Sequence, residues 1–297
     1  MNNKSVMKVI EGNADFFSRF EFDQLDKGKA KGTVEVYLRE LKRLDNWLKG
    51  SGGSIESITR YDVQAYINAL QAGEIVKNKS GEFIPASAAT IDRIFGTISV
   101  LAKYLDRTNI VEDIRRPKKQ SVTGIAPKSL DRNKINGLLR DVERDGNLRN
   151  IAVVNLLAYT GIRIGELVTL KRHDIDLRRG GELTVIGKGN KERKVPIPKE
   201  ARRHVQQYLE SRTDDLDALF LSNYNKPISK RSAQRIIEKY GYHAHELRHT
   251  YCRNLIRKGV DIVTVSQLAG HETIEVTRRY AMASEQEIEV QLNGLFD

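Results

Sequence analysis

The second half of the chain carries side chains that can bind an anion, transfer a proton or act as a nucleophile. The set combines two arginines, two histidines, a lysine and a tyrosine: Arg163, Lys188, His245, Arg248, His271 and Tyr280. They occur in five short segments, TGIRIGEL (160–167), GKGNKERKVPIP (187–198), HELRH (245–249), LAGHE (268–272) and RRYAM (278–282). Phosphoryl transfer without a metal ion requires these types of group: guanidinium donors for the phosphate oxygens, a nucleophile, a base and an acid.

The spacing of these residues indicates how helices could bring them together. Glu166 follows Arg163 by three residues, so on a helix its carboxylate can hold the guanidinium in place. His245 and Arg248 have the same spacing and can face one phosphate. Lys188 lies in a glycine-flanked turn, where its side chain could reach a leaving group. The pattern therefore predicts a phosphate site assembled from distant segments.

Bulk properties limit the class of protein. A chain of 297 residues with 39% hydrophobic residues is long enough for two domains. The net charge of +11 favours a polyanionic partner without identifying it, and both halves are basic. The single cysteine, Cys252, excludes an internal disulfide and a thiolate-rich metal site and indicates a cytosolic setting. With no signal peptide and no long apolar run, we expect neither secretion nor a membrane span.

Hydrophobic periodicity predicts that the first part of the chain is a bundle of about four helices. We expect helices over 15–25, from Thr33 to Gly50, from about residue 59 to 70 and over 87–105, with a small hairpin within 73–85. Thr33 is the predicted N-cap of the second helix, and Thr59 with Asp62 resembles a capping box for the third. The predicted domain covers residues 1–116.

A basic segment with prolines follows, and we interpret 117–128 as a linker; an exposed loop inside one domain is the alternative. The second domain, 129–297, is predicted to be mostly helical with a small antiparallel sheet. An alternating run, a Gly-Lys-Gly-Asn turn and a second extended run within 182–198 form its hairpin. Its last helix, 284–296, has an apolar stripe that could pack on its own domain or dock into a neighbouring protomer.

The five segments, in this order, resemble those of the tyrosine recombinases, or phage integrases, and the resemblance extends over nearly the whole chain. It implies a SAM-like, helical core-binding domain followed by the recombinase catalytic domain. It also implies that Tyr280 attacks DNA to form a 3′-phosphotyrosyl link while Arg163 and Arg248 clamp the scissile phosphate. In this family, four protomers on two synapsed duplexes exchange strands through a Holliday junction.

The resemblance implies further roles for matching residues. His245 would be the general base, Lys188 the general acid towards the 5′-oxygen, His271 a donor to the phosphate and Glu166 a support for the arginine. Because the covalent bond conserves the energy, the resemblance implies no metal, no ATP and no other cofactor. The partners would be a double-stranded recombination site, other copies of the chain as a dimer on one site and a tetramer on two, and accessory proteins, in the bacterial cytoplasm.

Basic residues of the first domain and the linker are candidate phosphate contacts, although each alone could be a solvated surface charge: Lys42, Arg43, Arg93, Arg115, Arg116, Lys118 and Lys119. The resemblance is to minimal, Xer-like or transposon-resolving recombinases. Resolution of dimers or cointegrates and integration or excision of a mobile element both remain open, as does the target sequence.

Three other functions are compatible with parts of the sequence. HELRH also matches HExxH, in which His245 and His249 would bind zinc, Glu246 would be the base and Glu272 a third ligand. That assignment leaves the other segments unexplained. A type IB topoisomerase would share the covalent step but relax DNA as a monomer. A non-catalytic architectural protein would bind DNA without needing the complete set of residues.

Overall fold

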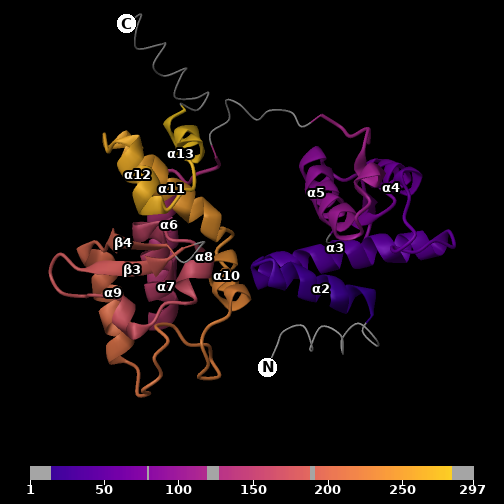
Figure 1. The fold of residues 1–297 in the computed structure, drawn as a ribbon. Coiled ribbons are helices and arrows are strands. Elements are labelled where there is room, and N and C mark those ends of the chain that lie inside the picture. Colours follow the sequence, from indigo (N-terminus) through magenta and orange to yellow (C-terminus); the bar gives the residue numbers. More distant parts are fainter. Residues whose placement is uncertain (1–14, 79, 119–126, 188–190, 283–297) are drawn as a thin grey trace, which may run out of the picture. The chain divides into compact units, whose positions relative to one another are not determined.

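The computed structural model describes residues 15–78, 80–118, 127–187 and 191–282. Contacts divide the chain into two compact units, Met1–Ser121 and Val122–Asp297 (Figure 1). Each unit has a hydrophobic core of its own. Both units are mainly helical with a small antiparallel sheet, as predicted. Within the described ranges, no helix is long and apolar enough to cross a membrane.

In its described part, the first unit packs four helices around a core that includes Phe20, Tyr66 and Ile98. Its elements are α2 (Phe16–Asp26), α3 (Lys31–Gly50), α4 (Arg60–Ala72), β1 (Val76–Lys77), β2 (Phe83–Ile84), α5 (Ala88–Tyr104) and the 3-10 turn η1 (Thr108–Val111). The predicted capping box is confirmed: the Thr59 hydroxyl accepts from the Asp62 amide, and the Asp62 carboxylate accepts from the Thr59 amide at 2.8 Å. The predicted small hairpin is confirmed as β1 and β2.

The predicted start of α3 at Thr33 is wrong. The helix begins at Lys31 and its N-cap is Ala30, which makes no side-chain capping bond. The Ala30 carbonyl accepts from the amides of Thr33, at 2.8 Å, and Val34, at 3.2 Å. Backbone bonds therefore form the first turn ahead of Thr33, so a cap signal in the sequence does not mark this boundary.

The second unit consists of eight helices, one 3-10 turn and one hairpin in its described part. They are α6 (Arg132–Arg144), α7 (Leu148–Thr160), α8 (Ile164–Leu167), η2 (Arg172–Asp174), β3 (Glu182–Ile186), β4 (Glu192–Pro196), α9 (Lys199–Glu210), α10 (Lys230–Glu238), α11 (Ala244–Arg257), α12 (Ile262–Ala269) and α13 (Ile274–Ala281). The predicted hairpin is confirmed, because β3 and β4 pair antiparallel with Leu183 opposite Val195 and Val185 opposite Arg193.

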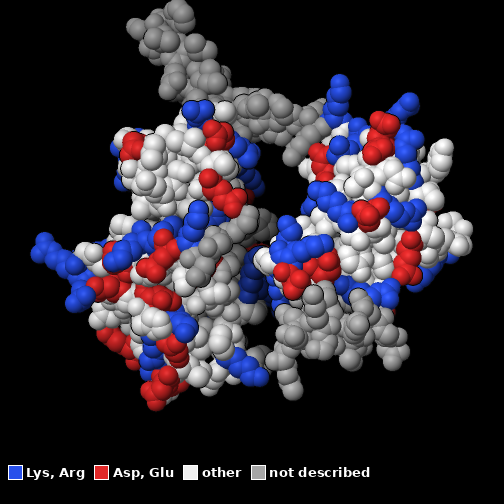
Figure 2. Space-filling model, viewed as in Figure 1, with Lys and Arg blue, Asp and Glu red and all other residues white. Residues whose placement is uncertain are grey.

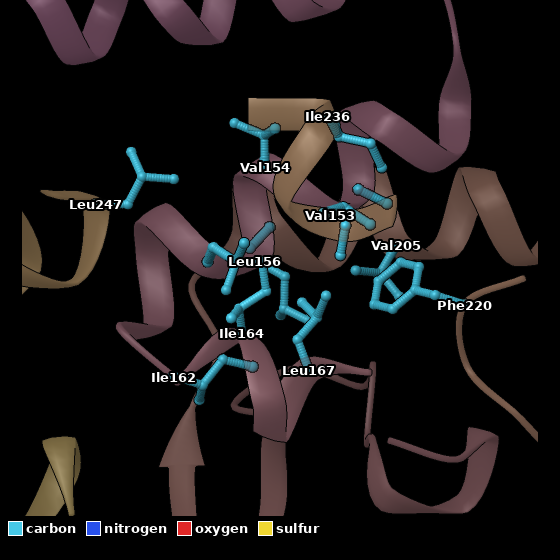
Figure 3. Packing of buried hydrophobic residues seen from close by; sticks show 14 of the residues in the cluster. Val153, Val154, Leu156, Ile162, Ile164, Leu167, Val205, Phe220, Ile236 and Leu247 are labelled. Carbon is cyan, nitrogen blue, oxygen red and sulfur yellow. The ribbon is translucent and has the colours of Figure 1, made fainter. Parts of the chain in front are cut away.

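Helix α7 is the centre of the second core. Every residue from Ile151 to Leu157 is buried, and all but Asn155 are apolar; Val153, Val154 and Leu156 lie among residues of α8, α9, α10 and α11 (Figure 3). A helix that is hydrophobic all round is stable only when other elements enclose it. Asn147 caps its start and Gly161, with φ of 62°, ends it. The position of this buried helix determines where Gly161 lies, and Arg163 follows two residues later.

Candidate active site

Arg163 lies two residues after Gly161, at the N-cap of α8. Its side chain is partly exposed and held at two points. Nη1 donates to Oε1 of Glu166 at 3.0 Å, as the spacing predicted, and Nη2 donates to the carbonyl of Gly270 at 2.7 Å. The guanidinium carries more N–H donors than these two bonds use. Arg163 is therefore oriented by the protein and can still bind an anion.

The Glu166 carboxylate is 7% exposed and joins two arginines. It accepts from the Arg163 amide at 2.7 Å and from both terminal nitrogens of Arg193 at 3.0 and 2.9 Å. Burial alone would raise the pKa of Glu166, but the hydrogen bonds and charges of Arg193 and Arg163 outweigh it and lower that pKa. The bidentate pair with Arg193 ties α8 to strand β4.

Arg193 was not among the predicted site residues. It lies on β4, and its Nε donates to the carbonyl of Leu268 at the end of α12, at 3.0 Å. The signal that could have found it is the alternation in the strand, because Arg193 and Val195 face inward while Glu192, Lys194 and Pro196 are exposed. An arginine on the inward face of a strand needs a buried acid, and Glu166 meets that need.

Arg248 on α11 is 4% exposed. Its Nη1 donates to the carbonyl of Gly161 at 2.7 Å and its Nη2 to that of Ala269 at 2.6 Å. Both carbonyls lie at the C-terminal ends of helices, α7 and α12, where they lack helical partners and carry partial negative charge. Burial, and then the positive charge of Arg163, lower the pKa of Arg248. The two guanidinium groups thus repel each other unless an anion joins them.

Tyr280 on α13 is 5% exposed and lies against two histidines. Its hydroxyl is 2.7 Å from Nδ1 of His249, on α11. The ring of His271 stacks on it with centroids 5.8 Å apart, while Nδ1 of His271 bonds the hydroxyl of the buried Thr277 at 2.7 Å. His245 lies one helical turn before His249, with ring centroids 6.3 Å apart. The sequence predicted no role for His249 in a phosphate site, yet this residue contacts the phenol.

The electrostatics of the cluster keep the imidazoles neutral. Burial and the neighbouring cations lower the pKa values of His249 and His271 to about 4 and lower that of His245 as well. Burial raises the pKa of Tyr280 to about 12. At neutral pH the site therefore presents two arginine cations, neutral imidazoles and a protonated phenol. Such a site can bind a phosphodiester, and a phenol beside it has the chemistry of a nucleophile.

Two predicted features lie outside the described residues. One is Lys188, which lies between β3 and β4 in the sequence, and the other is the helix predicted over 284–296. The contribution of Lys188 as an acid remains a prediction from the sequence.

The candidate phosphate contacts of the first unit are partly committed to internal pairs. Arg43 and Arg93 both donate to Glu40, at 2.8 and 2.9 Å, and this carboxylate is 3% exposed. The Lys42 ammonium lies 5.5 Å from the ring centre of Phe17. Glu40 therefore holds two of these arginines at fixed positions on α3 and α5.

Arg115 and Lys118 are exposed, and Arg116 donates to Asp92 at 2.9 Å, whereas Lys119 lies outside the described residues. Figure 2 shows many Lys and Arg side chains on the visible faces of both units, with Asp and Glu among them. On this face the positive side chains lie among negative ones, and no single described residue of the set stands apart as a contact.

The zinc arrangement suggested by HELRH is not assembled among the residues described. Glu246 accepts from the amide of His243 at 2.8 Å and pairs with the Lys128 ammonium at 3.0 Å, while Nδ1 of His249 faces Tyr280. No group of three His, Cys, Asp or Glu side chains in those ranges could hold a metal ion.

Both units match families of known proteins. Residues 128–287 match the phage integrase family, and residues 19–109 match the phage integrase N-terminal SAM-like domain. The chain is 29% identical over 286 residues to the tyrosine recombinase XerD of Staphylococcus epidermidis, covering 90% of this chain and 93% of that protein. It is 30% identical over 204 residues to XerA of Pyrococcus furiosus, covering 66% and 71%.

Solved structures have the same fold. The crystal structure of XerA recombinase matches with a TM-score of 0.52 and 25% identity, covering 94% of this chain and 97% of that one. XerH recombinase bound to its difH substrate matches with a TM-score of 0.67 and 19% identity, covering 98% and 88%. The chain therefore belongs to the phage integrase family and is a site-specific tyrosine recombinase, an enzyme that breaks and rejoins DNA.

Proposed function

We propose that this recombinase cleaves DNA through a 3′-phosphotyrosyl link to Tyr280. The observation that carries this assignment is the pair of oriented guanidinium groups in one cluster with a buried phenol. Arg163 and Arg248 are each held by two internal hydrogen bonds and keep further donors for the phosphate. Donors fixed before the reaction stabilise developing charge on the non-bridging oxygens without reorganising.

The remaining roles follow from position and from the family resemblance. His245 lies on α11, three residues before Arg248, and the family resemblance makes it a candidate for proton transfer at the phosphate. His271 donates to the phosphate, Lys188 protonates the leaving 5′-oxygen, and Glu166 positions Arg163. The step needs neither metal nor ATP, since the phosphotyrosyl bond preserves the energy of the phosphodiester.

We further propose that the chain acts as a dimer on one site and a tetramer on two synapsed sites, passing through a Holliday junction. Lambda integrase, which shares the fold at 19% identity, has been solved as a dimer bound to a core site. The biological reaction is resolution of DNA dimers or cointegrates, or integration and excision of a mobile element. Sequencing the DNA covalently captured in cells would separate these two, because only the second places the sites at the ends of a mobile element.

The test of the nucleophile is Tyr280→Phe, with Tyr251→Phe as the matched control. Tyr251 belongs to the same apolar cluster, on α11, but its ring packs against Gly161. The substrates are nicked duplexes that trap cleaved strands and carry the site identified by sequencing the DNA captured in cells. On these duplexes we expect no covalent adduct with Tyr280→Phe. Tyr251→Phe should still form one, and both should bind DNA. An adduct with Tyr280→Phe would eliminate the proposed nucleophile.

A further inference from the structure

The hydroxyl of Tyr280 has one hydrogen-bond partner in the described part of the chain, Nδ1 of His249 at 2.7 Å. The two rings lie with centroids 5.4 Å apart and an interplanar angle of 41°. His249 belongs to α11 and Tyr280 to α13, so this bond joins the helix that carries Arg248 to the helix that carries the phenol. A buried hydroxyl requires a partner, and His249 is placed to be that partner.

The other two histidines of the cluster are arranged differently. His271 is nearly parallel to the phenol, at 13°, so it meets the face of the ring, and its Nδ1 is engaged by Thr277 at 2.7 Å. His245 stacks on His249 at 27°, and among the described contacts it makes no hydrogen bond with Tyr280. The geometry therefore favours a different proton acceptor from the histidine that the resemblance implied.

We propose that His249 orients the Tyr280 phenol and accepts its proton during strand cleavage. This inference rests on the proposed role of Tyr280 as nucleophile. As Oη forms its bond to phosphorus, the bond from phosphorus to the 5′-oxygen breaks, the phenolic proton moves to Nδ1 of His249, and the leaving oxygen takes a proton from the acid. When strands rejoin, the imidazolium returns its proton to Oη. The required form of His249 is neutral, with its proton on Nε2.

The surroundings of His249 keep it in that form. Burial comes first, and the charges of His245, Arg248 and Arg279 add to it, so that the pKa of His249 falls to about 4 although Glu246 acts in the opposite direction. A phosphate bound between the arginines would offset part of their positive charge. The pKa of His249 would then rise towards its ordinary value, which makes it a stronger base when DNA is present.

The pKa of the Tyr280 phenol also depends on these charges. Burial and Cys252 raise its pKa, whereas Arg248, Arg279 and Arg163 lower it, to a net value of about 12. At neutral pH a phenol of this kind does not ionise unaided, so a base in direct contact has a large effect. General base catalysis of this type contributes roughly 10²–10⁴-fold to a rate.

The experiment compares three variants of the full chain on a nicked duplex that carries the mapped cleavage site. In His249→Asn, the amide oxygen can replace Nδ1 as an acceptor but cannot take a proton; His249→Ala removes both functions. His245→Asn is the matched control, one helical turn away. Single-turnover cleavage rates are measured against pH, and thermal unfolding and DNA binding report whether each variant is folded.

We expect both His249 variants to cleave roughly 10²–10⁴-fold more slowly at neutral pH, while still binding DNA. The wild-type rate should fall at acidic pH as His249 becomes protonated. His249→Asn should lose this acidic decline and should instead speed up with rising pH as the phenol ionises. His245→Asn should keep the acidic decline, even if its rate is lower.

Three outcomes would overturn the proposal: a wild-type rate in His249→Asn, an acidic decline that persists in that variant, or loss of the decline in His245→Asn instead. The pH dependence does not rely on the absolute rate, so a partly destabilised variant remains informative. Failure of this inference is distinct from failure of the nucleophile assignment. An adduct in Tyr280→Phe would refute the nucleophile and this inference with it, whereas the three outcomes above refute only the role of His249.

Discussion

Replacing Glu166 by Gln should weaken both the second unit and the catalytic site. The carboxylate accepts four hydrogen bonds, from the Arg163 amide, from Nη1 of Arg163 and from both terminal nitrogens of Arg193. A glutamine side chain offers one acceptor oxygen and turns its amide N–H groups towards guanidinium N–H groups. It also leaves two arginines beside a group without charge.

The size of the effect follows from burial. Glu166 is 7% exposed and the Arg193 side chain 13%, so this is a buried ion pair, whereas Arg163 is 38% exposed and its share is screened by solvent. Removing one partner of a buried pair costs about 3–5 kcal/mol, and we take about 3 kcal/mol. For a unit of this size, each kcal/mol lowers Tm by about 2–4 °C, which gives a decrease of about 6–12 °C.

The same substitution should slow cleavage because Arg163 loses a contact that orients it. A misplacement of about 1 Å near a reaction centre can reduce a rate by roughly 10²-fold. Calorimetry of the full chain measures the unfolding transition. The single tryptophan, Trp47, packs against the core of the first unit, so its fluorescence supplies an internal reference that the substitution should leave in place.

Glu182→Gln is the matched control, on the hairpin that also carries Arg193. Glu182 pairs with Lys194, and both side chains are well exposed, so solvent screens the pair and its removal should change stability little. If Glu166→Gln shifted Tm no more than this control and left the cleavage rate unchanged, the four-bond carboxylate would have no structural role and the reasoning would be refuted.

Two other predictions concern the geometry and charge of the site. In thermal unfolding, Gly161→Ala should destabilise the protein more than Gly241→Ala. Both glycines have positive φ, but a methyl group at 161 would lie 2.2 Å from the ring of Tyr251, whereas nothing lies within 4 Å of one at 241. Equal losses of stability would contradict this prediction. Histidines in the unfolded chain bind protons below about pH 6.5, whereas His249 and His271 in the folded chain stay neutral down to about pH 4. The free energy of unfolding, measured in urea, should therefore fall as the pH is lowered from about 6.5 to about 4. Sulfate should reduce the fall by binding the arginines, and a stability independent of both pH and sulfate would argue against the anion site.

Local patterns in the sequence predicted the elements whose stability is local. The capping box of Thr59 and Asp62 and the β3–β4 hairpin depend on neighbours within a few residues, and both formed as predicted. Thr33 shows the limit of such signals, since backbone bonds to Ala30 begin the helix earlier. The contact of Arg163 with Glu166 was likewise predictable, because three residues along one turn bring the two side chains together.

The chemistry of the site was also readable in the sequence, because the types of group needed at a phosphate are few. The sequence could not show which imidazole meets the phenol, or what holds the arginines. His249 reaches Tyr280 from 31 residues away, Arg193 reaches Glu166 from 27, and Arg248 reaches the carbonyl of Gly161 from 87. These contacts depend on where buried helices end and how they pack. The sequence therefore predicted the candidate groups, whereas Arg193 and the proton and charge connections of the site appeared only in the tertiary structure.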